Sequence, residues 1–98
     1  MAQFKLMGLG EEFEGKEFIF ESRLTIGRSI DNDIVIAKPG VSRNHAEIAL
    51  KDGKLMIRDL GSSNGTRVNG EEIIHKELKS GDRLEVENVQ LVLVSSVT

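Results

Sequence analysis

Apolar residues recur at every second position through most of this chain. Leu84 and Val86, for example, alternate with charged residues. This period indicates β-strands that bury one face, because successive side chains of a strand point to opposite sides. The same alternation occurs around six further pairs of apolar residues: Phe4 and Leu6, Phe18 and Phe20, Leu24 and Ile26, Ile34 and Ile36, Ala46 and Ile48, and Leu55 and Ile57. No window shows a convincing helical period, so we expect an all-β fold.

Two segments depart from the alternation. Residues 89–94 are nearly continuously apolar, which predicts a strand buried on both faces. Residues 71–78 are compatible with one short turn of helix.

Turn-forming residues separate the apolar runs. Asn-Gly pairs supply the positive φ angles that tight hairpins require. Such signals occur at residues 8–10, 31–33, 38–40, 52–53, 64–65, 69–70, 80–82 and 87–88. Many short strands at near-regular spacing predict an antiparallel β-sandwich or barrel. Neither a linker nor an internal repeat interrupts the pattern, so we expect one domain over residues 1–98.

Composition narrows the possible chemistry. The 98 residues include no cysteine, which excludes a disulfide framework and cysteine-ligated metal. The two histidines, His45 and His75, are too isolated to predict a metal cluster. No apolar run of about 18 residues predicts a membrane span, and the first residues do not resemble a signal peptide. We therefore expect a cytoplasmic protein that binds no metal and no cofactor.

Positive charge is concentrated in one segment of an acidic chain. The net charge is −3, which argues against a general nucleic-acid-binding protein. Residues 23–45, however, carry four basic and two acidic residues, and the segments on either side are both net negative. A local positive field of this kind favours a specific anionic ligand over a long polyanion.

Three polar clusters follow or precede predicted strands. The first is Gly27-Arg28-Ser29, the second is Ser42-Arg43-Asn44-His45, and the third covers residues 59–70. Small residues in such clusters expose backbone N–H groups, and hydroxyls and amides add further hydrogen-bond donors. Because loops at one end of a sandwich lie together, the three clusters predict one site for an anion or a peptide backbone.

A catalytic interpretation is weaker. Ser42, His45 and Asp59 include the residue types of a hydrolase triad, but the sequence has no nucleophile elbow. Residues 10–16 have most of the spacing of a phosphate-binding loop, but Glu17 replaces the required Ser or Thr. We therefore expect that the protein is not an enzyme and that His45 has a structural role. Residues 10–16 are expected to form a hairpin tip.

The ordered clusters strongly resemble the forkhead-associated (FHA) domain family. The matching motifs are Gly27-Arg28, Ser42-Arg43-x-His45, and Asp59-Leu60-Gly61-Ser62-x-Asn64-Gly65-Thr66-x-Val68-Asn69-Gly70. The resemblance covers about residues 3–95. It implies a sandwich of eleven strands that binds phosphothreonine in partner proteins through loops at one end.

The resemblance also implies a role for each motif residue. Arg28 pairs with the phosphate, and Ser42 donates its hydroxyl to it. Arg43 adds a donor or steers the ligand. Ser63 contacts the phosphothreonine region, and Asn64 hydrogen-bonds the peptide backbone beside it.

Four further residues are expected to support this site. Gly27 permits a sharp turn, His45 braces the second loop, Gly65 supplies a positive φ, and Thr66 ties the third loop to the first.

The implied partner is a threonine-phosphorylated protein or peptide, the product of a Ser/Thr kinase. Selection of threonine over serine is attributed in this family to a small pocket for the γ-methyl group. Residues 37–41 are expected to influence the ligand residue three places after the phosphothreonine, with Lys38 favouring an acidic one. No nucleic acid or membrane partner is implied. The alternative is a phosphate-independent scaffold that assembles a complex through a sheet face.

Overall fold

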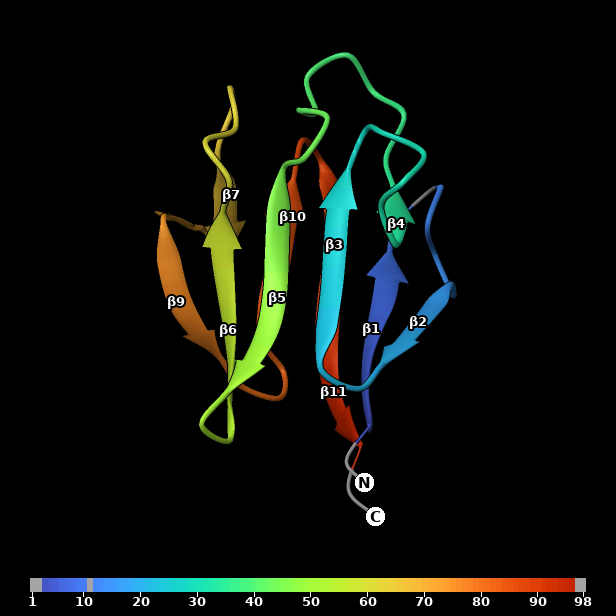
Figure 1. The fold of residues 1–98 in the computed structure, drawn as a ribbon. Helices are drawn as coiled ribbons and strands as arrows, with labels where there is room; N and C mark the ends of the chain where they lie inside the picture. The colour runs from blue at the N-terminus through green and yellow to red at the C-terminus, as the bar shows by residue number, and fades with distance from the viewer. Residues whose placement is uncertain (1–2, 11, 97–98) are drawn as a thin grey trace.

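Eleven β-strands form the protein in a computed structural model, which describes residues 3–10 and 12–96 (Figure 1). The strands are β1 (Gln3–Leu9), β2 (Glu17–Phe20), β3 (Arg23–Gly27), β4 (Ile34–Val35), β5 (Ala46–Lys51), β6 (Lys54–Asp59), β7 (Thr66–Val68), β8 (Glu71–Ile73), β9 (His75–Leu78), β10 (Arg83–Val86) and β11 (Val89–Ser96). The expected all-β fold is therefore confirmed, and the strand number matches the one that the family resemblance implied.

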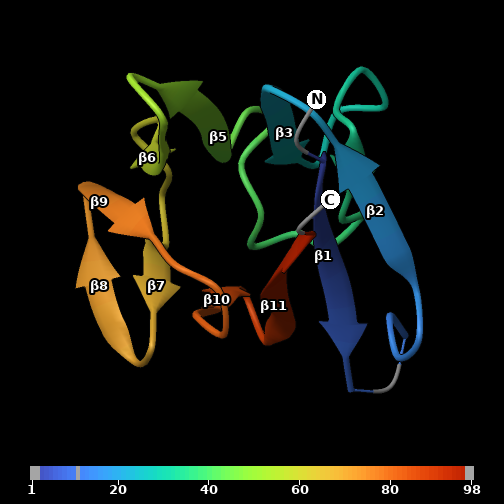
Figure 2. The ribbon, with the colours of Figure 1, turned by 90° about the horizontal axis from the view of Figure 1, so that it is seen from below.

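The strands form two sheets that pack face to face. Sheet A has the order β2-β1-β11-β10-β7-β8, and sheet B has the order β4-β3-β5-β6-β9. The view from below shows them as two layers (Figure 2). The described pairings are antiparallel except for β3 with β4, which run parallel, so sheet B is mixed.

The core lies between the two layers and is built by the alternating residues. Ile26, Ile48 and Ile57 from sheet B and Leu6 and Leu91 from sheet A are all fully buried. Side chains of each inner face interdigitate with those of the other in such sandwiches. The alternation in the sequence therefore selects the core face of each strand.

Hairpin turns adopt the positive φ angles that their residues predict. Asp52 and Gly53 join β5 to β6 with φ of 51° and 79°, and Asn69 and Gly70 join β7 to β8 with φ of 52° and 87°. Residues 10–16 form the tip of the β1–β2 hairpin as expected, where the Gly8 N–H donates to the Lys16 carbonyl (2.8 Å). Residue 11 lies outside the described residues.

Two local expectations were wrong. The segment 71–78 forms strands β8 and β9 instead of a turn of helix. Strand β11 buries Leu91 and Leu93, whereas Gln90 is exposed and Val92 and Val94 are only half-buried. The residues of its apolar run therefore alternate between the buried face and the outer face of sheet A. Within the described residues, no helix has the length and apolar character needed to cross a membrane.

Replacement of Ile57 by Ala tests the core. Ile57 is fully buried, so we expect the free energy of unfolding to fall by about 2–5 kcal/mol in urea denaturation, because the truncated side chain leaves a cavity. Ile74→Ala is the matched control. Ile74 is 80% exposed, and its truncation is expected to change stability by less than about 0.5 kcal/mol. Equal losses for the two variants would contradict this core assignment.

Candidate functional site

The first two polar clusters and residues 60–65 of the third lie at one end of the sandwich, at the top of Figure 1. They occupy the β3–β4, β4–β5 and β6–β7 loops, whereas residues 66–70 form strand β7 and the β7–β8 turn. The first two loops are joined through their backbones: the Arg28 N–H donates to the Ser42 carbonyl (2.9 Å), and the Ser29 N–H donates to the Arg43 carbonyl (3.2 Å). The fold thus gathers the first two predicted clusters and the β6–β7 part of the third into one surface.

Gly27 allows the first two loops to approach each other. A Cβ atom at this position would overlap the Arg43 carbonyl oxygen and would lie 2.6 Å from the Asn32 side-chain nitrogen. Asn32 fills the remaining space and donates from its Nδ2 to the carbonyls of Ser29 (2.9 Å) and Arg43 (2.7 Å). A larger residue than glycine would therefore separate the loops.

The Arg28 side chain is exposed and partly fixed. Its Nε–H donates to the Val41 carbonyl (2.9 Å), which aligns the guanidinium with the β4–β5 loop. Its two terminal nitrogens make no hydrogen bond or ion pair with the described residues. A planar guanidinium held in this way can offer two parallel N–H groups to a phosphate or carboxylate.

His45 is fully buried and joins the second loop to the third. The Ser42 N–H donates to its Nδ1 (3.2 Å), and its Nε2 lies 2.8 Å from the Gly65 carbonyl oxygen. A backbone N–H can only donate and a carbonyl can only accept. Both contacts are therefore satisfied by a neutral imidazole with its proton on Nε2.

Two further bonds join the same loops and leave groups available at the surface. The Ser42 hydroxyl oxygen accepts from the Ser63 N–H (3.1 Å), and the Asn64 Nδ2 donates to the Gly40 carbonyl (2.8 Å). The Ser42 hydroxyl hydrogen and the Asn64 amide oxygen remain available for a ligand. Arg43, Ser63 and Asn64 are exposed, and Ser42 is half-buried.

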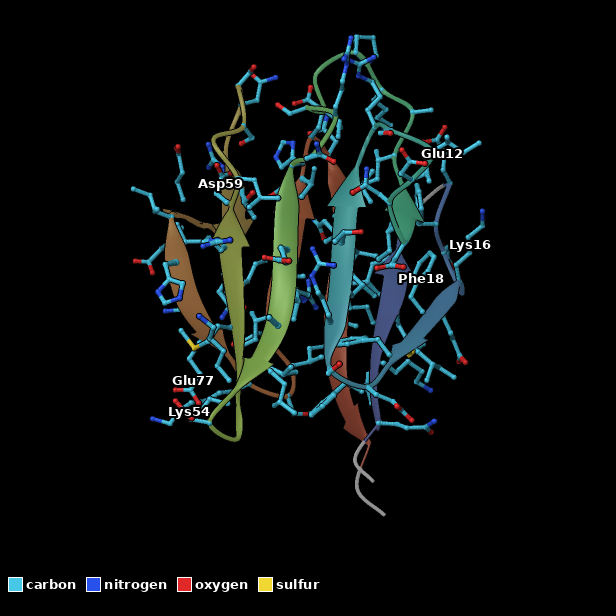
Figure 3. All side chains as sticks on the ribbon, viewed as in Figure 1. Glu12, Lys16, Phe18, Lys54, Asp59 and Glu77 are labelled. Atoms are coloured by element: carbon cyan, nitrogen blue, oxygen red, sulfur yellow. The ribbon has the colours of Figure 1, made fainter. Side chains whose placement is uncertain are left out.

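Asp59 organises the third loop, a role that the sequence did not lead us to expect. It lies where β6 ends, near the top of the sandwich (Figure 3). Its Oδ1 accepts the N–H groups of Gly61 (2.9 Å) and Ser62 (2.8 Å). Its Oδ2 accepts the hydroxyls of Ser62 (2.6 Å) and Thr66 (2.7 Å). Partial burial raises the pKa of Asp59, but these hydrogen bonds outweigh that effect and hold it below its ordinary value of 3.8.

The buried Thr66 therefore has a different role from the one expected. It was expected to tie the third loop to the first, but its hydroxyl bonds Asp59 at the start of its own loop. The sequence contains a signal for this arrangement, because an Asp directly after a strand often accepts hydrogen bonds from the following backbone. The bracing role of Asn32 has no comparable local signal.

The structure does not assemble Ser42, His45 and Asp59 into a triad. Both ring nitrogens of His45 contact backbone groups, and the Asp59 carboxylate is bonded to Ser62, Thr66 and Gly61. No hydrogen bond joins His45 to Asp59 in the described part of the chain. Residues 3–10 and 12–96 also contain no group of three metal-ligating side chains that could hold an ion.

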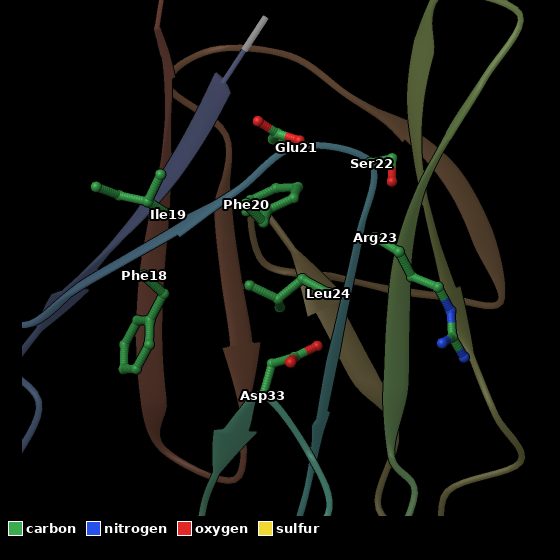
Figure 4. Close-up of a pocket in the computed structure, with 8 residues that line it drawn as sticks. All are labelled: Phe18, Ile19, Phe20, Glu21, Ser22, Arg23, Leu24 and Asp33. Atoms are coloured by element: carbon green, nitrogen blue, oxygen red, sulfur yellow. The ribbon is translucent and has the colours of Figure 1, made fainter.

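A cavity of about 520 Å³ lies between β2 and β3 and reaches the β3–β4 loop only at Asp33 (Figure 4). Phe20 and Leu24 line it, and Arg23 points away from it toward β5, where it pairs with Glu47. The Asp33 carboxylate at its edge already accepts from the Thr25 N–H (2.8 Å) and hydroxyl (3.2 Å). Arg23, the one cation among the lining residues, faces away from the cavity.

The two packed sheets and the polar loops joined at one end define a β-sandwich binding domain. Comparison with known families agrees with this class and is more specific. The model of the FHA domain matches residues 24–87, and the chain belongs to this family. It is a family of binding domains and not of enzymes.

Three similar proteins illustrate the relationship. The glycogen accumulation regulator GarA of Mycolicibacterium smegmatis is 37% identical over 82 residues, which cover 83% of this chain and 52% of GarA. The structure of Mycobacterium tuberculosis EmbR in complex with a low-affinity phosphopeptide has a TM-score of 0.89 at 32% identity, covering all of this chain and 26% of the other. An FHA domain solved in a study of phosphothreonine-dependent FHA domain interactions has a TM-score of 0.85 at 25% identity, with full coverage of both chains.

Replacement of His45 by Ala tests the link between the second and third loops. The variant leaves the Ser42 N–H and the Gly65 carbonyl without partners, and each unpaired group is expected to cost about 1–3 kcal/mol of unfolding free energy in urea denaturation. His75→Ala is the control, because His75 is exposed on β9. A stable His45→Ala variant would show that the loops do not depend on this bridge.

The Asp59 carboxylate predicts a specific dependence of stability on pH. Its pKa is lower in the folded than in the unfolded protein, so its contribution is fully present above about pH 4 and is lost as the pH falls through the folded pKa. We expect Asp59→Asn to be less stable than the wild type at pH 7, and the difference to shrink as the pH falls below 3.8. Urea denaturation over a pH series measures this difference.

Asp31→Asn provides the control for the Asp59 measurement. Asp31 is exposed, and its carboxylate accepts no hydrogen bond from the described residues. A difference between wild type and Asp59→Asn that stays constant from pH 7 to acid would contradict the assigned role of Asp59.

Proposed function

We propose that this protein binds phosphothreonine in partner proteins through the β3–β4, β4–β5 and β6–β7 loops. The observation that carries the proposal is the free end of the Arg28 guanidinium. The Val41 carbonyl holds this guanidinium against the β4–β5 loop, which also contains Ser42. Its setting in an FHA domain supports the same function, since EmbR, a structural relative, is described in complex with a phosphopeptide.

Each proposed contact follows from the groups that the fold leaves unused. The terminal nitrogens of Arg28 bind the phosphate as a charge-assisted pair. The Ser42 hydroxyl donates to a phosphate oxygen, while its own oxygen remains bonded to the Ser63 N–H. Asn64, which is already bonded to Gly40, accepts a backbone N–H of the peptide through its amide oxygen. Arg43 and Ser63 contact the ligand from the exposed edges of the second and third loops.

Specificity is part of the proposal. A pocket for the threonine γ-methyl group would favour phosphothreonine over phosphoserine by roughly 1 kcal/mol, the value of one buried methyl. Residues 37–41 would influence the ligand residue three places further on. The Lys38 ammonium is paired with Glu12 at 3.4 Å, so an acidic ligand residue would have to compete with Glu12 for it.

We propose one FHA unit over residues 1–98, with a core at about residues 3–95. The family model matches only residues 24–87, but β1 pairs with β11 along seven residues of each strand. Both strands are thereby part of sheet A. The chain spans about half the length of the curated relatives it matches, so their activities as whole proteins are not transferred to it.

The proposed setting is signalling in the cytoplasm, where kinases use ATP to phosphorylate threonine. A kinase product is the partner, and the module itself performs no reaction. The alternative function is a phosphate-independent scaffold of the same fold. The two functions differ in what Arg28 contributes to the complex, and one experiment therefore separates them.

Replacement of Arg28 by Ala is expected to weaken binding of a phosphothreonine peptide by about 2–5 kcal/mol, because the phosphate loses its charged partner. Arg28→Lys keeps the charge but loses the planar pair of donors, and we expect an intermediate loss. Calorimetric titration with phosphorylated and unphosphorylated forms of one peptide measures both effects. The unphosphorylated form is expected to bind no variant appreciably.

Lys54→Ala is the control for loss of one positive charge, because Lys54 lies at the opposite end of the sandwich from the loops (Figure 3). It should bind the phosphopeptide as the wild type does. Equal affinities of the wild type for both peptide forms would refute phosphothreonine binding. A partner complex that survives Arg28→Ala would support the scaffold function instead.

A further inference from the structure

The outer face of sheet A carries an ordered row of residues across four strands. The register places Glu17 of β2 opposite Met7 of β1, Met7 opposite Val92 of β11, and Val92 opposite Arg83 of β10. Directly opposite residues in an antiparallel sheet point to the same side. The neighbouring residue Leu6 is fully buried in the core, so this row faces away from the sandwich.

This outer face is more apolar than a solvated sheet face usually is. Such faces normally alternate with the core side and carry polar residues. Here Met7, Leu9, Val92 and Val94 all point outward and are half-buried, and Ile19 of β2 is 62% exposed. Strands β1 and β11 therefore have apolar residues on both of their faces. We call the surface formed by these five residues the outer stripe.

Charges of opposite sign flank the outer stripe. Glu17 lies on its β2 side and Arg83 lies on its β10 side. Lys5 lies inside the stripe, opposite Ile19 and Val94, but its ammonium reaches Glu17 at 3.4 Å. The stem of Lys5 can therefore cover apolar surface while its charge stays at the edge. Arg83 makes no ion pair with the described residues.

We propose that the outer stripe is the interface of a homodimer with a twofold axis parallel to the strands. A rotation about that axis exchanges the two sides of the row. Glu17 then faces Arg83 of the partner subunit, and Met7 faces Val92 of the partner subunit. The symmetry produces each contact twice, as in any isologous interface. Two sheets packed in this way lie about 10 Å apart, within reach of such side chains.

The arrangement of charges selects this axis over the other one. A twofold axis perpendicular to the strands would place Glu17 over Glu17 of the partner subunit and Arg83 over Arg83 of the partner subunit. Like charges placed together across an interface oppose association. The same side chains therefore favour one orientation and disfavour the other.

The selected axis has a consequence for the loops. Rotation about an axis parallel to the strands keeps the loop end of both subunits on the same side of the dimer. Two candidate sites would then face in one direction, suited to a partner that carries two phosphothreonines. This consequence rests on the proposed function, whereas the dimer itself does not. Linked binding of both sites raises the apparent affinity well above that of one site.

Sedimentation velocity and light scattering over a concentration series test the dimer directly. We expect the wild type to shift from the mass of one chain to that of two as concentration rises. Val92→Glu places a charge in the centre of the stripe and is expected to remain monomeric. Glu17→Arg and Arg83→Glu each create like-charge contacts at both ends, and each is expected to weaken the dimer by about tenfold or more.

The charge-exchange variant distinguishes this interface from a general effect of charge. Glu17→Arg combined with Arg83→Glu restores opposite charges and is expected to recover the dimer. Lys54→Glu and Glu77→Arg, in strands β6 and β9 of sheet B, should dimerise as the wild type does. Circular dichroism verifies that each variant is folded, and the edge variants remain informative if Val92→Glu does not fold.

Three results would overturn the dimer proposal. They are a wild type that stays monomeric at all concentrations, single charge variants that dimerise like the wild type, and association that continues beyond two chains. Arg28→Ala is expected to dimerise normally, because Arg28 lies outside the stripe. A dimer without phosphopeptide binding would therefore refute the proposed function alone, and phosphopeptide binding by a strict monomer would refute the dimer alone.

Discussion

The candidate site depends on one buried imidazole. His45 accepts from the Ser42 N–H and donates to the Gly65 carbonyl, and these two groups belong to different loops. The histidine satisfies both groups and sets the distance between the loops. The bonds from Ser63 to Ser42 and from Asn64 to Gly40 lie across the same gap. They require the spacing that His45 establishes.

The other loop contacts form a second level of support. Asp59 fixes the course of the third loop through four hydrogen bonds. Asn32 donates to Ser29 within the first loop and to Arg43 of the second, which fixes these two loops together. These contacts use carboxylate, hydroxyl and amide groups that would otherwise be available to a ligand. Among the described residues, the groups that remain free include the terminal nitrogens of Arg28, the hydroxyl hydrogen of Ser42, the amide oxygen of Asn64 and the exposed side chains of Arg43 and Ser63. The loops thus separate the residues that build the site from those that are available to bind.

Sequence patterns predicted the strands that carry alternating apolar residues and missed those that do not. Strands with clear alternation were identified because each buries one face against the core, as Leu84 and Val86 do. Strands β7, β8 and β9 were missed because each contains a single apolar residue, so no alternation can appear. Residues 71–78 were compatible with a helix for the same reason. The three site loops were predicted from their composition. An Asp at the end of a strand also indicates the bonds that Asp59 accepts from its own loop. The bond from Asn32 to Arg43, however, depends on how two loops fold onto each other, which no local pattern encodes.

The apolar run at residues 89–94 differs in the structure from its prediction, and the difference identifies an apolar outer face on sheet A. Apolar residues at consecutive positions predict burial on both faces, since periodicity cannot tell which surface covers each side. In the structure, the core covers Leu91 and Leu93, while Val92 and Val94 lie on the outer face beside Met7. Strand β1 repeats the pattern with Leu6 inside and Met7 outside. Two adjacent strands that are apolar on both faces are costly to leave in water, because each uncovered apolar group gives up the gain of burial. A second sheet on that face removes the cost, and the opposite charges at its two sides admit another copy of the chain in one orientation.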